Sequence, residues 1–406
     1  MDFDDSQEEA RFRSGVRAWL AEYGPRYVPA ENADDADVVA LAKAWQSALA
    51  DAGYAGFGFP AAIGGRPGAL IEQVIFNQEV AGHPMTHVEI MVQGCAIALP
   101  TILAHGSAGQ IERLGRATIR GDVIWCQLFS EPGAGSDLAG IRTSARAVGD
   151  QWEINGQKVW TSGALYADWG LLVARTDPDV PKHKGLTYFL LDMKSAGVTV
   201  RPLRQMGGRA EFNEVFLDDV RIPDSMRLGG VGDGWKVAIA TLSNERLGLL
   251  HDSAVSRNLI APLLRIAART RCADGTPVLE DSLFQQRLAS YYAAVSGVEQ
   301  IGNRIITALS QGSTPGPEAT IGKVTLTRHL QLMAEFGLEL AGMSGATIDQ
   351  AGQDDLYQVQ QGFFLAPGYR MGGGTEEIAK NIIAERVLGL PPDHRLDKDL
   401  PFSALT

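Results

Sequence analysis

The 406-residue chain is poor in cysteine and has no excess of basic residues. Its cysteines, Cys95, Cys126 and Cys272, include no CxxC pair. They therefore predict neither a disulfide framework nor a zinc site, and they fit a reducing compartment. The chain carries 36 lysines and arginines against 48 aspartates and glutamates, which gives a formal net charge of −12. A general nucleic-acid-binding protein needs a basic surface to release phosphate counterions, so this composition argues against that class.

The sequence also lacks a long apolar run. Its most apolar stretch, Ile90–Ala104, is too short to span a membrane and is interrupted by Gln93, Gly94 and Pro100. The first residues, Met1–Asp5, are acidic where a secretory signal would be basic and then apolar. We therefore expect a cytoplasmic protein with no membrane span.

No spacing of histidines predicts a metal site. His83 and His87 would lie on one face of a helix, but Pro84 stands between them and argues against a regular helix there. We expect no bound metal.

The apolar pattern changes twice along the chain. Residues 1–122 show the helical period, residues 123–232 carry short runs of branched and aromatic residues, and residues 233–406 return to the helical period. No helix-length stretch separates the short runs, which favours antiparallel pairing, and Asn155-Gly156 is typical of a hairpin turn. The chain is also longer than one hydrophobic core usually grows. The sequence predicts a mostly α protein of the α+β class, with an N-terminal helical domain, a middle antiparallel, barrel-like β domain and a C-terminal four-helix bundle.

A glycine-rich segment, Phe129–Gly140, follows the first predicted strand. Its glycines would let the backbone approach a ligand closely, and the hydroxyl groups of Ser130 and Ser136 could donate hydrogen bonds. The GxGxxG spacing is absent and no helix follows, so this is not a dinucleotide-binding fingerprint. On composition alone, an ordinary surface loop explains this segment as well as a ligand-binding loop does.

This segment resembles the signature of acyl-CoA dehydrogenases, and further motifs of that family follow in the expected order. Asn155–Gly163 resembles the second flavin-contacting segment, and Phe212–Val220 continues the pattern. Gly373–Ile378 and then Asn381–Gly389 resemble the closing motif. The family has a helical domain, a β domain and a four-helix domain, which is the order predicted above from the apolar pattern.

The resemblance implies an FAD site built from two segments of the β domain. Trp160 would pack against the flavin, although a lone tryptophan in a strand is more often a core residue. Thr161 and Ser162 would bond near the reactive nitrogen, and Ser136 would also contact the pantetheine or thioester side of the substrate. The remaining implied FAD contacts in this domain are Gln127, Phe129, Ser130 and Gly135.

The resemblance also implies FAD contacts from the C-terminal region. Arg271 falls where the family places an arginine on the FAD pyrophosphate of a neighbouring subunit, and a bidentate guanidinium suits that group. Asp274 replaces the aromatic residue expected nearby, Arg269 is a competing candidate, and an ordinary surface arginine is the alternative. Thr375 and Glu377 match further FAD positions, with Glu377 an acid where an amide is common.

The family needs a catalytic base, and its usual position here is Gly373, which has no side chain. Some members supply the base from the first helix of the C-terminal domain, where this chain has Glu245. Ala238, Leu242, Glu245 and Leu249 fall on one helical face, so this carboxylate shares an apolar stripe that should raise its pKa. The alternative is that Glu245 makes a structural ion pair.

Other residues compete with these assignments or complete them. Glu131 and Glu376 are the competing carboxylates. Gly373 would still polarise the substrate through its backbone N–H, as the family implies. Arg246 would either contact the coenzyme A end of the substrate or hold helices together.

The sequence therefore predicts FAD-dependent α,β-dehydrogenation of an acyl-CoA to trans-2-enoyl-CoA. The resemblance implies electron transfer to an electron-transfer flavoprotein and a homotetramer or homodimer, with a heterotetramer as the alternative. Rival functions are an acyl-CoA oxidase or flavin monooxygenase on the same fold, and a non-catalytic subunit of a mixed tetramer. We expect no nucleic-acid partner. The acyl group is not predicted.

Overall fold

The computed structural model describes residues 5–30, 33–68, 70–251, 254–311, 316–317, 319–347 and 355–405, without the side chains of residues 86, 87, 89, 245–251, 254–258, 309 and 310. The chain forms two compact units. One comprises Met1–Glu245 with His394–Thr406, and the other comprises Arg246–Asp393.

The first unit begins with a helical region. Local signals fix where its helices begin, because capping boxes at Ser6 and Ser107 satisfy the first free N–H groups of two of them. A π-helical turn, Gly94–Ala98, interrupts the apolar stretch Ile90–Ala104 just before Pro100. The helices are α1 (Gln7–Tyr23), α2 (Asp35–Asp51), α3 (Leu70–Val80), α4 (Glu89–Gln93), α5 (Leu99–His105) and α6 (Ala108–Arg120).

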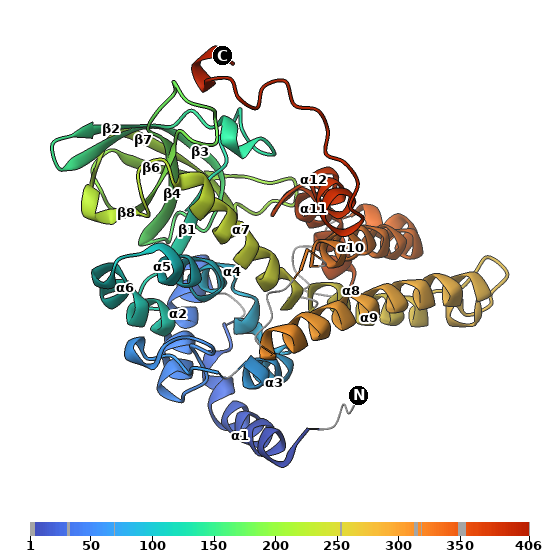
Figure 1. Ribbon diagram of the computed structural model, residues 1–406. Coiled ribbons are helices and arrows are strands. Elements are labelled where there is room, and N and C mark those ends of the chain that lie inside the picture. Colours follow the sequence, from blue (N-terminus) through green and yellow to red (C-terminus); the bar gives the residue numbers. More distant parts are fainter. Residues whose placement is uncertain are drawn as a thin grey trace. The chain divides into compact units, whose positions relative to one another are not determined.

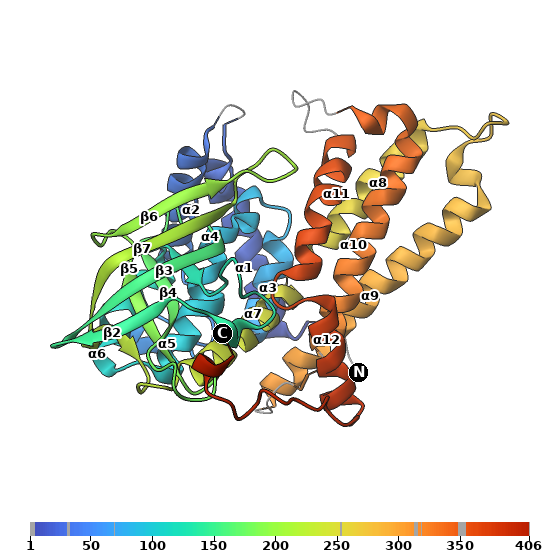
Figure 2. The ribbon, with the colours of Figure 1, turned by 90° about the horizontal axis from the view of Figure 1, so that it is seen from above.

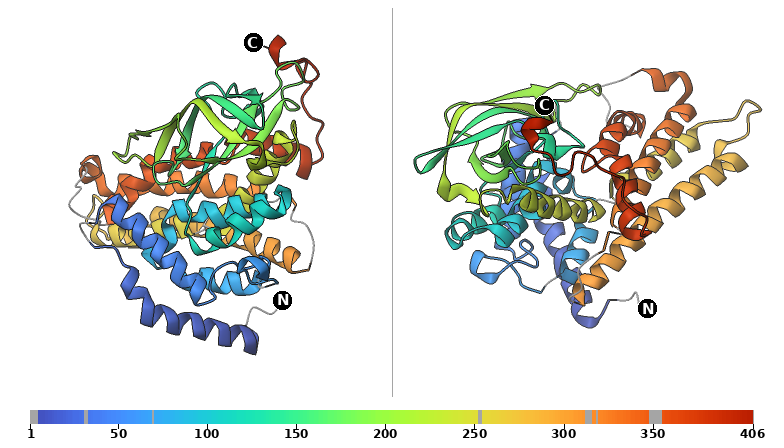
Figure 3. Two further views of the ribbon diagram at one scale, coloured as in Figure 1. Left: turned by 90° about the vertical axis from the view of Figure 1, so that its left-hand side faces the viewer. Right: turned by 45° about the horizontal axis from the view of Figure 1, so that its top comes forward.

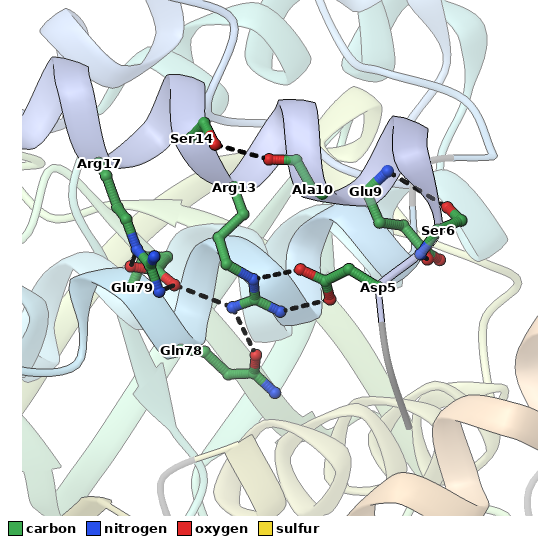
Figure 4. Close-up of polar contacts among 9 residues, drawn as sticks. All are labelled: Asp5, Ser6, Glu9, Ala10, Arg13, Ser14, Arg17, Gln78 and Glu79. Carbon is green, nitrogen blue, oxygen red and sulfur yellow. Dashed lines mark hydrogen bonds and ion pairs between the residues drawn. The ribbon is translucent and has the colours of Figure 1, made fainter. Parts of the chain in front are cut away.

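A polar cluster joins α1 to α3 (Figure 4). Glu79 of α3 accepts hydrogen bonds from Arg13 at 2.9 Å and from Arg17 at 2.7 Å. Arg13 also pairs with Asp5 at 2.6 Å. The pKa of Glu79 lies below its usual value, chiefly because of the hydrogen bond from Arg17. This network aligns α1 along α3 beside their apolar contacts.

The β domain follows the helices as one sheet in the order β6-β7-β3-β2-β4-β5-β8, with β1 paired to β4. Most neighbours are antiparallel, as predicted, while β1 and β2 each pair with β4 in parallel. The strands are β1 (Trp125–Leu128), β2 (Ser144–Val148), β3 (Gln151–Ser162), β4 (Trp169–Arg175), β5 (Leu186–Asp192), β6 (Val198–Leu203), β7 (Phe212–Pro223) and β8 (Arg227–Leu228).

The hairpin turn predicted at Asn155-Gly156 is wrong, because β3 runs straight through it. The pairing of β3 with β7 shifts register at this point, and the side chain of Asn155 bonds Asp219 on β7 instead of closing a turn. The glycine is required for close approach, since a Cβ atom at Gly156 would lie 2.4 Å from Thr143 Oγ1. A bulge and a turn demand similar residues, so the local sequence does not distinguish them.

The helical region and the sheet share a continuous apolar core. Ile97, Ala98 and Ile102 of the α4–α5 region pack with residues of β1, β4 and β5, and Val237 and Ala238 join them. Figures 1 and 3 show the blue and cyan helices on one side of the green strands. Helices therefore cover one side of the sheet and pack against its strands.

The second unit is a bundle of long helices. Buried residues from α8, α9, α10 and α11 form its main core, which confirms the predicted four-helix bundle (Figure 2). The helices are α7 (Gly234–His251), which begins in the first unit, then α8 (Ala254–Arg269), α9 (Ser282–Ser310), α10 (Ala319–Ala341), α11 (Asp355–Met371) and α12 (Glu376–Ile382). Among the described residues, no helix combines the length and the apolar character that a membrane crossing requires.

Candidate active site

Trp160 is the most unusual residue of the β domain. Its side chain is 62% exposed, although it lies within β3, and its φ of 60° is in the left-handed region. Such a backbone costs a non-glycine residue about 1–3 kcal/mol, so the surrounding structure must impose it. The register of β3 against β7 shifts between Lys158 and Thr161, and the ring of Phe212 meets Trp160 edge-on at 6.0 Å. Trp160 is therefore a surface aromatic, in contrast to the core alternative.

A buried ion pair joins the two predicted flavin-contacting segments. Lys158 Nζ lies 2.8 Å from Glu131 Oε1 and donates to the carbonyl of Phe129 at 3.0 Å. Glu131 also accepts the backbone N–H groups of Arg142 and Thr143 at 2.6 and 2.9 Å. The pair thus fixes the start of the glycine-rich segment against β3, directly beside Trp160.

Burial and the opposite charge act in opposite directions on the pKa of each partner of this pair. Burial would raise the pKa of Glu131, but the charge and the hydrogen bonds of Lys158, with those of Thr143 and Arg142, outweigh it and hold that pKa below its usual range. Burial lowers the pKa of Lys158 to about 8, against the opposing effect of Glu131. Glu131 is therefore committed to a structural role.

The structure places the other predicted residues of the first segment along an accessible edge. Gln127 and Ser130 are half-buried, Phe129 is buried, and Ser136 is exposed. Ser130 accepts the backbone N–H of Val159 through its carbonyl at 2.9 Å, so the segment lies alongside β3. No heavy atom lies within 4 Å of where a Cβ would stand at Gly133 or Gly135, which leaves the loop open on that side.

The two hydroxyl residues after Trp160 are not equivalent. Burial alternates along the strand, so Ser162 is half-buried on the side of Trp160 while Thr161 is buried on the other. Among the residues that the structure describes, the Thr161 hydroxyl has no hydrogen-bond partner, and neither does the nearby side-chain oxygen of Asn213. Ser162 is therefore better placed than Thr161 to contact a ligand that covers Trp160.

A pocket of about 220 Å³ adjoins this segment. Thr143, whose backbone N–H is bound by Glu131, is one of the residues that line it. Its walls include Glu131, Pro132, Gly133, Arg142, Thr143 and Gln157. The exposed aromatic surface and the open glycine loop together fit a planar cofactor, because folding alone leaves the face of Trp160 uncovered.

In the second unit, a buried lysine organises the closing motif. Lys323 of α10 donates to the carbonyls of Gly372 and Gly374. Gly373 between them has a φ of 64°, a conformation that a residue with a side chain rarely adopts. Thr375 then caps α12 by accepting the N–H of Ile378 at 3.2 Å, while Glu377 is exposed.

Glu376 is held between two cations. It pairs with Lys380 at 2.6 Å and with Arg370, whose Nε lies 2.9 Å away. The hydrogen bond from Lys380, followed by that from Arg370, lowers the pKa of Glu376. Both carboxylates that compete for the role of base, Glu131 and Glu376, are therefore ion-paired within their own units.

The predicted pyrophosphate residue lies in the loop after α8. Arg271 is exposed and donates to the carbonyl of Gly275 at 3.0 Å. The competing Arg269 lies 3.6 Å from Asp355. Of the two, Arg271 is the one whose charge is not paired with a carboxylate among the described residues.

The predicted base lies in α7. The backbone places Glu245 one helical turn beyond Thr241, and Thr241, Ala238 and Val237 are buried. The side chains of Glu245 and Arg246 lie outside the described residues. Both assignments stay predictions.

Of the two histidines considered for a metal site, His83 has a structural role. The ring of His83 stacks on Trp45 at 4.4 Å and its Nε2 lies 3.0 Å from the carbonyl of Gly24. The side chain of His87 lies outside the described residues.

Two lysines that organise these motifs, Lys158 and Lys323, could have been recognised from the sequence by their apolar surroundings. Lys158 lies in a strand next to the buried Val159, and Lys323 lies on the buried face of α10 with Thr327 and Leu330. A lysine on an apolar face is expensive unless it is paired, so each marks a buried anchor.

The protein combines a helical region, a β domain and a helical bundle with an exposed aromatic site on the β domain. Sequence profiles of the N-terminal, middle and C-terminal domains of acyl-CoA dehydrogenases match residues 6–122, 126–220 and 232–388. The chain belongs to the acyl-CoA dehydrogenase family, whose members are FAD-dependent oxidoreductases. The predicted family, fold class, enzyme class and cofactor are confirmed.

Named relatives support the same assignment. The chain is 40% identical over 346 residues to acyl-CoA dehydrogenase FadE34 of Mycobacterium tuberculosis, a match that covers 85% of this chain and 46% of that protein. The chain thus spans about half the length of this relative. It is 34% identical over 392 residues to acyl-CoA dehydrogenase IpdE1 of the same organism, covering 95% of this chain and 98% of the relative.

Solved structures show the same fold. The ChsE4-ChsE5 complex of Mycobacterium tuberculosis matches with a TM-score of 0.81 and 26% identity, over 97% of this chain and 100% of that chain. The Tcur3481-Tcur3483 steroid ACAD matches with a TM-score of 0.79 and 25% identity, also over 97% and 100%.

Proposed function

We propose that this protein catalyses the FAD-dependent α,β-dehydrogenation of an acyl-CoA thioester to the trans-2-enoyl-CoA and passes the electrons to an electron-transfer flavoprotein. The observation that carries the proposal is the exposed Trp160, whose strained backbone is held beside Phe129 and Ser130 by the buried Glu131–Lys158 pair. An aromatic residue fixed on the surface at such a cost provides a flat face for a ring system.

The residues that would hold FAD come from both units. When bound, FAD accepts the hydride that leaves the β carbon of the substrate. The residues assigned to it in the β domain are Gln127, Phe129, Ser130, Gly135, Ser136, Trp160, Thr161 and Ser162. Those assigned in the helical unit are Arg271, Thr375 and Glu377.

Glu245 is the proposed base that removes the α-proton. The position of Glu245 in α7 supports this role, and so does the exclusion of the other candidates. Glu131 and Glu376 are engaged in ion pairs that lower their pKa values. A base that accepts protons near neutral pH needs a raised pKa instead. The backbone N–H of Gly373 would polarise the thioester carbonyl, Ser136 would contact the pantetheine side, and Arg246 would contact the coenzyme A end.

Anaerobic titration of the purified protein tests this function. Straight-chain, branched and steroid-like acyl-CoAs are added while the visible flavin spectrum is recorded, for the parent protein, Glu245→Gln and the exposed control Glu280→Gln. At least one thioester should bleach the parent and the control, whereas Glu245→Gln should bind FAD and reduce it about a thousandfold more slowly, as expected for loss of a general base. Equal bleaching of Glu245→Gln and the parent would reject Glu245 as the base.

Two further outcomes separate the rival functions. Rapid reoxidation of the reduced protein by oxygen, with peroxide released, would favour an acyl-CoA oxidase. A colourless protein that takes up no FAD would favour a subunit of a mixed assembly, and the match to the ChsE4-ChsE5 complex gives this alternative a specific basis.

The acyl group is proposed to be bulky and ring-bearing. The support is the likeness to the Tcur3481-Tcur3483 steroid ACAD. Faster bleaching by a steroid-like thioester than by straight-chain thioesters of equal concentration is the expected result. We place this reaction in the cytoplasm.

A further inference from the structure

The segment His394–Leu405 returns to the β domain and belongs to the first unit (Figure 1). It pairs with the loop between β4 and β5. The N–H of Phe402 donates to the carbonyl of Val180 at 2.9 Å, and the N–H of Ser403 donates to that of Pro178 at 2.8 Å. The segment is thus fastened by backbone bonds at a defined register.

One side chain of this segment covers a buried arginine. The guanidinium carbon of Arg175 lies 3.5 Å from the ring centroid of Phe402, which is only 8% exposed. Arg175 donates to the carbonyl of Ala139 at 2.6 Å and to that of Ile141 at 3.0 Å. The arginine therefore holds the end of the glycine-rich segment, and Phe402 shields it from water.

A second side chain reaches the same segment through a lysine. Lys182 Nζ lies 2.8 Å from Asp137 Oδ2 and 3.0 Å from Asp397 Oδ2. Its side chain is 91% buried, whereas Asp137 is mostly exposed and directly follows Ser136. Asp397 therefore fixes the ammonium group that in turn fixes the loop residue beside Ser136.

We propose that Asp397 and Phe402 are positioning residues, which act through Lys182 and Arg175 to hold the segment Phe129–Gly140 in the shape that binds the coenzyme A thioester. Both contacts act on the C-terminal side of the open stretch around Gly135 and Ser136, one at Asp137 and the other at Ala139 and Ile141, and the open stretch has few packing contacts of its own. The thioester as the ligand rests on the proposed function, while the restraint on the loop does not.

The first experiment compares Asp397→Asn with the exposed control Asp399→Asn and the conservative Asp397→Glu. The dissociation constant for the reactive acyl-CoA should rise about fivefold in Asp397→Asn, the scale of a lost, partly buried ion pair. The rate of flavin bleaching at saturation and the FAD content should stay within twofold of the parent. Asp397→Glu should recover most of the affinity. A lower bleaching rate with unchanged affinity, or an equal effect of Asp399→Asn, would overturn the proposal.

A second measurement needs neither substrate nor activity. Hydrogen–deuterium exchange of peptides covering residues 132–142 should be faster in Asp397→Asn and in Phe402→Ala than in the controls Asp399→Asn and Leu405→Ala. Unchanged exchange in both variants would reject the restraint itself. A protein that no acyl-CoA bleaches, but whose loop exchanges faster in these variants, would reject the proposed reaction and leave the restraint intact.

Discussion

At the scale of single residues, the buried lysines share one task. Lys158, Lys182 and Lys323 are the buried lysines of the described residues, and each holds a segment predicted to bind a ligand. Lys158 and Lys323 donate to backbone carbonyls, and Lys182 donates to a carboxylate beside Ser136. A buried ammonium group is costly unless its donors are used, so each lysine fixes its segment in one conformation.

Trp160 permits a test of backbone strain. Trp160→Gly should unfold at higher urea concentration than Trp160→Ala, by about 1 kcal/mol in the free energy of unfolding of the flavin-free protein, because glycine tolerates a φ of 60° and alanine does not. Both variants should bind FAD more weakly than the parent, which titration of the flavin absorbance would show. Equal stability of the two variants would mean that the strained backbone relaxes when the indole ring is removed.

At the scale of elements, the strand β3 and the glycine-rich segment depend on one ion pair. Glu131→Gln leaves the side chain of Lys158 buried without its charge partner, so that the lysine either stays charged at a cost or gives up its proton at a cost. The substitution should lower the free energy of unfolding at pH 7 by about 3 kcal/mol. Glu153→Gln, on the same strand with exposed partners Arg146 and Arg221, is the matched control and should lower it by less than about 1 kcal/mol. Urea denaturation followed by circular dichroism measures both.

The pH dependence of the same variant has a definite sign. The folded-state pKa of Glu131 lies below its ordinary value, so its contribution to stability is present above that ordinary value and is lost as pH falls through the folded pKa. Loss of this carboxylate also lowers the pKa of the buried Lys158 further in the variant, so the variant loses stability as pH falls from 7. The difference between the parent and Glu131→Gln should therefore be at least as large at pH 5 as at pH 7 and narrow at lower pH. A difference that disappears already at pH 6 would contradict the assignment of an ionised carboxylate.

At the scale of the whole molecule, the two units have separate cores and different spectroscopic signals. All seven tryptophans lie before residue 246 and therefore in the first unit, while the second unit is helical. Tryptophan fluorescence should report unfolding of the first unit, and circular dichroism at 222 nm should report largely the helices of both. We expect the two urea transitions of the flavin-free protein not to coincide. Superimposable curves at two protein concentrations would instead show that the units unfold as one.

The sequence alone was sufficient for the order of regions and for the family. Helical and strand periods are local patterns, and the glycine-rich and closing motifs lie within short stretches, so Phe129–Gly140, Asn155–Gly163 and Gly373–Ile378 could be located without coordinates. Local residue preferences also predicted a turn at Asn155-Gly156. That prediction failed because pairing with β7, far along the chain, turned the same residues into a bulge.

Tertiary structure decided which of the candidate groups are already engaged. Glu131 and Lys158 are 27 residues apart, and Lys323 is 51 residues from Gly374, so no local pattern reveals these contacts. The same holds for the return of Asp397 to Lys182 and for the exposure of Trp160, which the sequence alone favours as a core residue. Motifs are determined by neighbours along the chain, whereas burial and ion pairing are determined by neighbours in space, and the availability of a carboxylate or a ring for chemistry depends on the latter.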